Sequence, residues 1–184
     1  ICSFMLCLID MEIVLASKNK NKIKEMQQLV NELCERDIKI LSLEDIGFEG
    51  DIIEDGQTFE ENAMIKARAV SALGYIGVGD DSGLAVDALD GAPGIYSARY
   101  AGDHNDAANN AKLLREMADK TDRGAAFVCA VACSFPDGEG KEDFCVRGES
   151  RGVIAHEESG EGGFGYDPLF YVPAFDKNFA QMSA

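Results

Sequence analysis

The stretch EIVLASKNKNKIKEMQQLVNEL, residues 12–33, decides the fold class of this chain. Its apolar beginning, residues 12–16, is a short run typical of a buried strand. The polar, lysine-rich segment 17–22 follows as a loop. Apolar side chains then recur at helical spacing and predict a helix over residues 21–35; they are Ile23, Met26, Leu29, Val30 and Leu33. The stretch therefore predicts a strand, a loop and a helix in succession.

The remaining chain repeats this alternation of strands and helices before it changes character. A T-x-x-E capping box at Thr58 and Glu61 predicts the start of a second long helix. Further elements are expected as strands over 38–43, 75–79, 84–88, 124–135, 141–149 and 169–172, and as a helix over 106–118. Helices between the early strands favour parallel pairing there, and the late hairpin is antiparallel. We expect an α/β fold with a mixed central β-sheet flanked by helices.

The overall charge limits the class of ligand. The chain has 184 residues, which suits one domain, and 46% of them are hydrophobic. Its 17 Lys and Arg stand against 33 Asp and Glu, a net charge of −16. A nucleic-acid polymer is not expected as a partner, because binding one draws on a basic surface. A small phosphate ligand is compatible with an acidic protein when lysines or a metal gather locally.

The chain ends and the cysteines bear on compartment. Residues 1–10 are apolar but too short to span a membrane, and they lack the basic start of a signal peptide. We expect Met11 to be the natural start, residues 11–184 to form a single domain, and a C-terminal segment to be missing after Ala184. The six cysteines show no CxxC spacing, so a structural zinc site is not expected. A reducing, cytoplasmic location fits best.

The lysine-rich loop at residues 17–22 is a candidate phosphate site. It lies where a strand turns into a helix, and the amides at a helix N-terminus favour anions. Lys18, Lys20 and Lys22 add positive charge to an otherwise acidic chain. The segment lacks the GxxxxGK[ST] pattern of a P-loop. Taken alone, it equally describes a solvated lysine cluster on a turn.

Carboxylates gather in two places that could serve a metal. Asp80 and Asp81 come at the predicted end of a strand, where two adjacent carboxylates repel each other unless a cation offsets them. Mg²⁺ prefers such hard oxygen ligands, and a carboxylate can also deprotonate a water. The acidic run 49–55 could supply a further ligand. Lys66, on the helix after Thr58, either reaches a phosphate or is simply exposed.

The glycine-rich stretch GGFGYDP, residues 162–168, is a candidate base site. Its glycines allow a backbone to come close to a ligand. Phe164 and Tyr166 offer aromatic faces on which a base could stack. The alternative is a tight connection whose aromatic rings fill the core.

These segments, in this order, resemble the inosine/xanthosine triphosphate pyrophosphatase family, which removes non-standard purine nucleotides. The similarity covers about residues 11–182. It is carried by the motifs VLASKNKNK (14–22), TFEENAMIKA (58–67), DDSGLAVDAL (80–89), GAPGIYSARYAG (91–102) and GGFGYDPLF (162–170). The resemblance implies a fold in which the site lies in a cleft between two lobes, and a working homodimer.

The resemblance also implies roles for single residues. The segment from Ser17 to Lys22 would bind the triphosphate, with Asn19 and Lys22 in contact with it. The residues assigned to this segment are Ser17, Lys18, Asn19, Lys20, Asn21 and Lys22. The general base and metal-linked residue would be Asp81, assisted by Asp80, and the second metal ligand would be Glu54.

Four further assignments complete the implied site. Ser82 would touch the substrate, and Lys66 would lie near the phosphates. The base would be cradled by Phe164, Gly165, Tyr166 and Asp167. One departure is clear: the family continues with a lysine and a Ser-His-Arg motif that help recognise the purine, and this sequence ends at Ala184 without them.

The implied reaction is the Mg²⁺-dependent hydrolysis of ITP, dITP or XTP to a monophosphate and pyrophosphate, with no role for a nucleic-acid polymer or a membrane. Two alternatives stay open. A Maf-like pyrophosphatase would share the fold and the metal chemistry but prefer another base. A non-catalytic nucleotide-binding protein would bind the same ligand without turnover.

Overall fold

The computed structural model describes residues 11–102, 104–138 and 140–182, so the predicted extension 1–10 lies outside the described part. The strands are β1 (Met11–Leu15), β2 (Ile38–Leu41), β3 (Ile76–Val86), β4 (Gly124–Ser134), β5 (Phe144–Ile154), β6 (Phe170–Val172) and β7 (Lys177–Asn178). The α-helices are α1 (Lys20–Leu33), α2 (Phe59–Ser71) and α3 (Asp106–Glu116). Three short 3₁₀ helices are η1 (Asp87–Leu89), η2 (Gly94–Arg99) and η3 (Phe179–Gln181).

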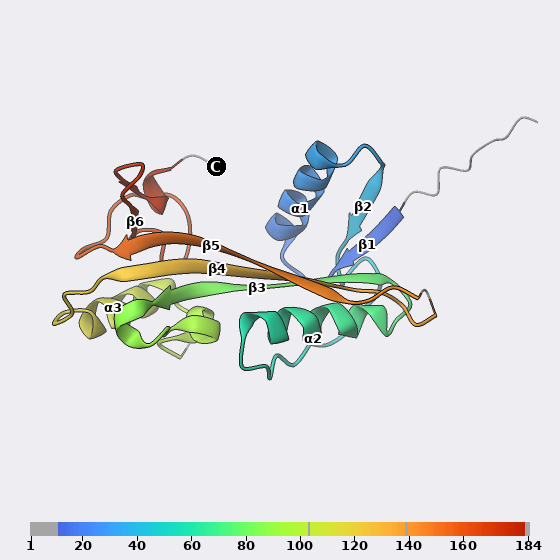
Figure 1. Ribbon diagram of the computed structural model, residues 1–184, viewed down its shortest axis with the longest axis horizontal. Helices are drawn as coiled ribbons and strands as arrows, with labels where there is room; N and C mark the ends of the chain where they lie inside the picture. Colours follow the sequence, from blue (N-terminus) through green and yellow to red (C-terminus); the bar gives the residue numbers. More distant parts are fainter. Residues whose placement is uncertain (1–10, 103, 139, 183–184) are drawn as a thin grey trace, which may run out of the picture. The chain divides into compact units, whose positions relative to one another are not determined.

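The strands that the structure describes form one mixed sheet in the order β2-β1-β3-β4-β5-β6-β7 (Figure 1). Strand β1 pairs in parallel with both β2 and β3, whereas β6 pairs antiparallel with β5 and β7. The predicted α/β class with a mixed sheet flanked by helices is therefore confirmed. The two-residue strand β7 was not expected from the sequence, because so short a run carries no periodicity.

The chain divides into two compact units. Unit 1 comprises the residues up to Gly56, Glu61–Asp80 and Val131–Cys145, and unit 2 comprises Gln57–Glu60, Asp81–Ala130 and Val146–Ala184. Strands β3, β4 and β5 contribute residues to both. The expectations of a single domain over residues 11–184 and of a cleft between two lobes stay predictions.

Unit 1 is built around the opening strand–loop–helix. Helix α1 lies beside β2 (Figure 1), and the core beneath is formed by Val14, Ala16, Leu41, Leu43 and Val70. Helix α2 packs closely on β3 because Gly77 and Gly79 carry no Cβ: one placed there would run into the helix backbone at Ala67 and Ala63. The helix begins directly after Thr58, where the capping box predicts it.

The exposed edge of unit 1 is covered by a side chain. Gln27 of α1 donates from Nε2 to the Ile38 carbonyl and accepts from the Ile40 amide, both at 2.8 Å. The amide group of Gln27 thus stands where a neighbouring strand would pair with β2. Unpaired strand edges invite association, and covering them is a common protection.

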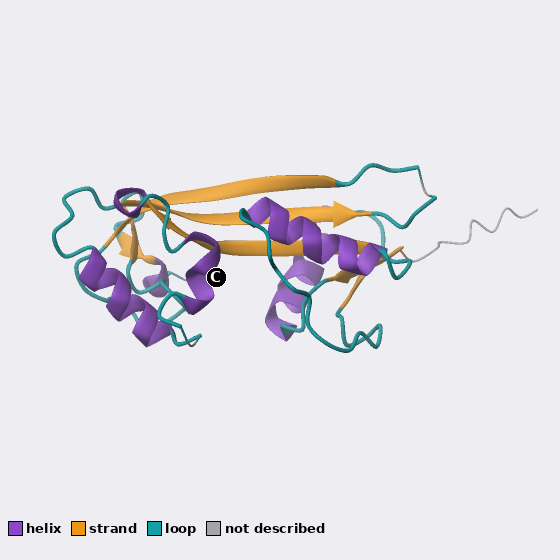
Figure 2. Ribbon diagram, turned by 90° about the horizontal axis from the view of Figure 1, so that it is seen from below, coloured by secondary structure: helices purple, strands orange, loops and turns teal. Residues whose placement is uncertain are grey.

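Unit 2 has its own, larger core. Helix α3 lies against one face of the strands of this unit (Figure 2). Leu113 of α3 and Met117, the residue directly after the helix, are fully buried. They pack with Leu84, Val86, Ala125, Ile154, Tyr166, Leu169, Phe170 and Val172. No helix within the described ranges is both long and apolar enough to cross a membrane.

The buried faces of α1 and α3 depart from a simple division into apolar and polar residues. Leu29 and Leu33 of α1 are 52% and 81% exposed, because the helix covers only a short, two-strand corner of the sheet. In α3 the buried residues are Asn109, Asn110 and Leu113, whereas Ala111 is exposed. Hydrogen bonds to neighbouring loops hold the two asparagines inside.

Candidate active site

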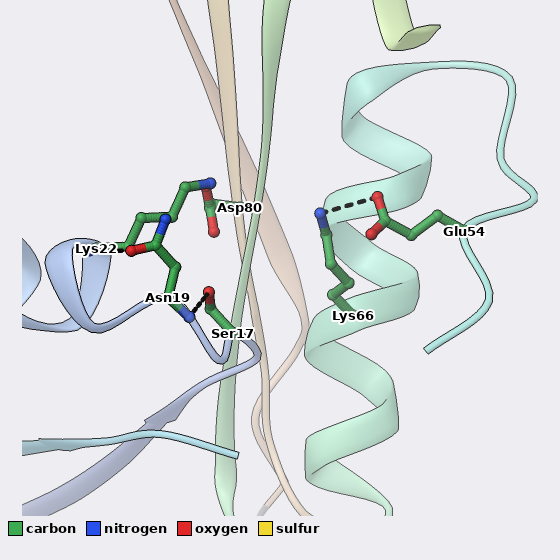
Figure 3. A network of polar contacts seen from close by, with 6 residues as sticks. All are labelled: Ser17, Asn19, Lys22, Glu54, Lys66 and Asp80. Carbon is green, nitrogen blue, oxygen red and sulfur yellow. Dashed lines mark hydrogen bonds and ion pairs between the residues drawn. The ribbon is translucent and has the colours of Figure 1, made fainter. Parts of the chain in front are cut away.

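The loop between β1 and α1 is folded by its own polar side chains. Asn19 precedes α1, and its Oδ1 accepts from the Lys22 amide at 3.4 Å, the geometry of a helix N-cap. Ser17 Oγ accepts from the Asn19 amide at 3.1 Å (Figure 3). The first turn of α1 contains no acidic residue. The start of this helix therefore combines exposed amides with lysines, which suits an anion.

The lysines of this loop have different surroundings. Lys18 Nζ donates to the Gly50 carbonyl at 2.7 Å and contacts Asp51 at 3.0 Å, so it holds the acidic loop. Lys20 is exposed and lines a groove of about 780 Å³ between α1 and the end of β2 with the loop that follows it. Lys22 forms an ion pair with Asp80. The side chain of Asn21 lies outside the described part.

A second lysine–carboxylate pair lies in the same unit. Lys66 of α2 reaches Glu54 at 3.0 Å, and only 11% of its side chain is exposed (Figure 3). Glu54 is 36% exposed. The structure thus brings together two pairs of predicted site residues within unit 1, Lys22 with Asp80 and Lys66 with Glu54. A lysine with so little exposure is not the simple surface residue that its position in the sequence also allowed.

The two adjacent aspartates lie inside a strand, not at its end. Strand β3 runs without interruption through Asp80, Asp81 and Ser82, which corrects the predicted break after Gly79. Successive side chains of a strand point to opposite faces, so the two carboxylates are separated by the strand itself. Asp80 closes unit 1, while half-buried Asp81 and exposed Ser82 open unit 2.

Gly83 shows why this strand needs a glycine directly after the acidic pair. It is buried, and a Cβ at this position would lie 2.6 Å from the Gly94 carbonyl and 3.0 Å from the Phe59 ring. Ser97 Oγ accepts from the Leu84 amide at 2.8 Å in the same region. The loop that contains η2 therefore packs directly on β3 of unit 2.

The donor set fits a hard divalent cation in its chemistry. Glu54, Asp80 and Asp81 offer carboxylate oxygens, and Mg²⁺ typically uses one or two carboxylates together with water and phosphate oxygens. Among the residues described, no group of three or more His, Cys, Asp or Glu side chains converges. Within unit 1, a lysine balances the charge of Glu54 and another balances that of Asp80.

The aromatic loop of unit 2 separates its two rings. Phe164 is 82% exposed, whereas Tyr166 is 4% exposed and donates from its hydroxyl to the Ser97 carbonyl at 2.8 Å. Burial raises the pKa of the Tyr166 phenol, so it stays a hydrogen-bond donor. Only Phe164 thus presents a free ring face. The prediction that the loop from Phe164 to Asp167 cradles a base stays a prediction, with Phe164 exposed and Tyr166 buried.

Asp167 is partly buried within this loop. Its Oδ2 accepts from the Phe164 amide at 2.9 Å. Burial raises the pKa of the Asp167 carboxyl, the Phe164 hydrogen bond opposes that shift, and the charge of Asp106 adds to it. The carboxylate therefore helps fold the loop, in addition to any contact with a ligand.

Several residues that organise these loops carry no motif that sequence reasoning had singled out. Asn109, 2% exposed, accepts from the Ala101 amide at 2.7 Å and donates towards two carbonyls of η2. Asp106 and Asn110 both contact Gly165. Their spacing of four residues places them on one helix face, and polar residues on an otherwise buried face were the signal available.

Comparison with known proteins places these features in a family. The family model described as the Ham1 family matches residues 13–184. The dITP/XTP pyrophosphatase of Leuconostoc mesenteroides is 44% identical, and the alignment covers 95% of this chain and 87% of that protein. The dITP/XTP pyrophosphatase of Bacillus licheniformis is 46% identical, with coverage of 94% and 87%.

Solved structures agree with the sequence comparison. The Ham1 protein of Staphylococcus aureus superimposes with a TM-score of 0.85 at 45% identity, over 94% of this chain and 86% of that chain. A HAM1 protein from Coxiella burnetii gives a TM-score of 0.86 at 41% identity, over 94% and 87%. The similarity therefore extends over nearly the whole length in both sequence and fold.

Proposed function

The chain belongs to the Ham1 family, and from that premise we propose that it hydrolyses non-canonical purine nucleoside triphosphates, ITP, dITP and XTP, to a monophosphate and pyrophosphate. Relatives named dITP/XTP pyrophosphatase support the reaction and the substrate class. The observation that carries the proposal for this chain is the Lys22–Asp80 pair, set at the start of α1 and directly before Asp81.

The triphosphate is held by the start of α1 and by two lysines. Backbone amides at the first turn of α1 and the ammonium group of Lys22 attract the phosphate oxygens. Lys66 supplies a second ammonium group, and both neutralise the charge that builds up as the phosphoanhydride breaks. Asp80, engaged by Lys22, positions that lysine. Ser17 and Asn19 shape the loop that carries it.

Asp81 is the proposed general base. It takes a proton from a water molecule, whose oxygen forms a bond to the α-phosphorus. The bond between the α-phosphorus and the bridging oxygen breaks, and pyrophosphate leaves with that oxygen. Ser82 lies next to Asp81 and is exposed, which allows a contact with the substrate.

A divalent cation completes the proposed site. Mg²⁺, with Glu54 and Asp81 as its protein ligands, polarises the phosphate oxygens when bound. Because Glu54 pairs with Lys66, cation binding would compete with this lysine and leave it for the phosphates. A magnesium titration of turnover, repeated with Glu54→Gln, tests the ligand: the variant should need a higher magnesium concentration for half-maximal rate.

The base is proposed to lie on the loop from Phe164 to Asp167, with the Phe164 ring stacked on the purine. We also propose a homodimer as the working state and the cytoplasm as the compartment. Light scattering on the purified protein measures the first. Imaging or fractionation of cells that express the chain tests the second.

The deciding experiment measures pyrophosphate release from ITP, XTP, ATP and GTP with Mg²⁺. We expect release from ITP and XTP, and a fall in rate of about 10²- to 10⁴-fold in Asp81→Asn, the range typical of removing a general base. Asp119→Asn, which changes an exposed aspartate after α3, is the matched control and should behave as wild type.

Three results would contradict this proposal, and each indicates a different alternative. Release from methylated or pyrimidine nucleotides, with none from ITP, would replace the proposal by a Maf-like activity. Binding of ITP without release would identify a nucleotide-binding protein. An Asp81→Asn variant as active as the Asp119→Asn control would remove Asp81 from the mechanism.

A further inference from the structure

The exposed ring of Phe164 belongs to a glycine-rich loop in which Asp167 accepts a hydrogen bond from the Phe164 amide. Gly163 and Gly165 both have positive φ angles, +76° and +59°. Glycine moves between backbone conformations more freely than any other residue, so such a loop needs outside contacts to keep one shape. Tyr166 anchors its far side through Ser97. The peptide of Gly165, next to Phe164, is held by helix α3.

Helix α3 binds both polar groups of Gly165. The Gly165 amide donates to Asp106 Oδ2 at 2.9 Å. Asn110 Nδ2 donates to the Gly165 carbonyl at 3.1 Å. Asp106 and Asn110 lie one turn apart on α3, so the same helix fixes both the amide and the carbonyl of Gly165. All of these contacts lie within unit 2.

The asparagine at position 110 is less favourable for stability than an apolar side chain of similar shape would be. It is 3% exposed, and its Oδ1 is a buried acceptor with no hydrogen-bond partner in the described part of the chain. Turning the amide over would place that oxygen against the Gly165 carbonyl, so the orientation is determined. A buried polar atom without a partner costs stability, and an apolar side chain of similar shape would avoid that cost. The contact with Gly165 is what the asparagine provides.

We propose that Asp106 and Asn110 are positioning residues for recognition of the base: they hold the Gly165 peptide so that the Phe164 ring stands ready to stack on the purine. This inference rests on the proposed function of the aromatic loop. Without the two contacts, Gly165 relaxes to other conformations and the ring of Phe164 loses its fixed place. Binding then suffers, while the groups that act on the phosphates are unchanged.

The test compares four variants in turnover of ITP and in thermal unfolding. Asn110→Leu and Asp106→Ala each remove one contact with Gly165. Asp106→Asn keeps an oxygen that can accept from the Gly165 amide. Asn105→Ala is the matched control, because Asn105 caps α3 through the Ala108 amide at 3.0 Å and makes no hydrogen bond to the loop among the described residues.

The expected pattern separates positioning from stability. Asn110→Leu and Asp106→Ala should raise KM for ITP about five- to tenfold, the loss expected for one hydrogen bond, with kcat nearly unchanged. Asn110→Leu should change the unfolding temperature little, since removing the unpaired Oδ1 offsets the loss of the hydrogen bond to the Gly165 carbonyl. Asp106→Asn should restore most of the affinity. Asn105→Ala should lower the unfolding temperature and leave KM unchanged.

Two results would overturn the inference. Unchanged KM in both Asn110→Leu and Asp106→Ala would show that the loop needs no support from α3. An equal rise of KM in Asn105→Ala would show that any weakening of the helix has this effect. Calorimetric titration with IMP applies the same comparison without turnover, so failure of the proposed hydrolysis is recognised separately. A wild-type chain that neither hydrolyses ITP nor binds IMP would refute both proposals.

Discussion

The proposed phosphate-binding residues of unit 1 and the aromatic loop of unit 2 are held in different ways. In unit 1, Lys18, Lys22 and Lys66 each pair with a carboxylate. In unit 2, the loop around Gly165 depends on backbone hydrogen bonds from α3 and on a buried tyrosine. Charge attracts a ligand over several ångströms, whereas stacking needs a ring in one place. The lysines of unit 1 therefore need less exact placement relative to a ligand than the aromatic ring of unit 2.

The largest expected effect comes from removing the lysines of unit 1. Lys22→Met and Lys66→Met should each lower kcat/KM about 10²- to 10³-fold, because each removes a charge that stabilises the breaking phosphoanhydride. Steady-state kinetics with ITP measures the loss. Lys24→Met removes an exposed lysine from the same helix as Lys22 and is the control. Losses no larger than that of the control would mean that neither ammonium group acts on the phosphates.

The corresponding test in unit 2 removes the exposed ring of Phe164. Phe164→Ala should raise KM about tenfold, since stacking of a base on an aromatic ring contributes about 1–3 kcal/mol. The thermal midpoint should stay unchanged, because the ring is 82% exposed and adds little to the core. Phe175→Ala, at another exposed phenylalanine of unit 2, is the matched control. A loss of stability without a change in KM would assign Phe164 to the fold instead.

Within the same loop, the buried Tyr166 is expected to contribute to the stability of the fold. Tyr166→Phe removes the hydroxyl that donates to the Ser97 carbonyl and should lower the free energy of unfolding by about 1 kcal/mol. Urea denaturation measures it. Tyr171→Phe removes a hydroxyl that contacts Asp176 at the surface and should have a smaller effect. Equal effects of the two substitutions would contradict the structural role given to Tyr166.

The smallest effect concerns an ion pair of unit 1 away from the lysines. The hydrogen bond from Arg68 lowers the pKa of Asp143 below its ordinary value. The stabilisation is therefore present above the pKa of an unfolded aspartate and is lost as pH falls through the lower, folded pKa. Because Arg68 is 65% exposed, the contribution is less than about 1 kcal/mol.

Arg68→Ala tests this pair by urea denaturation at several pH values. The variant should be slightly less stable than wild type at neutral pH. It should match wild type once Asp143 is protonated in both, and the difference at neutral pH should shrink in high salt. A difference that persists at low pH would mean that Arg68 stabilises the unit by packing.

Local patterns in the chain determined much of this protein. The apolar run before Ser17 and the capping residue Thr58 located a strand and a helix, because both signals act within a few residues. Lys22, Asp81 and the aromatic loop were found through their motifs. Charge and spacing were compatible with a phosphate ligand, and the resemblance carried by those motifs indicated both the phosphate-binding residues and the base.

Tertiary structure decided what depends on neighbours distant in sequence. It continued β3 through Asp80 and Asp81, which a local view of Gly and Asp residues reads as a turn. It exposed Phe164 and buried Tyr166, although the two stand two residues apart in one motif. It also gave Asn110 a contact with Gly165, 55 residues further along the chain. Burial and hydrogen-bond partners are properties of the packed molecule, and no local pattern contains them.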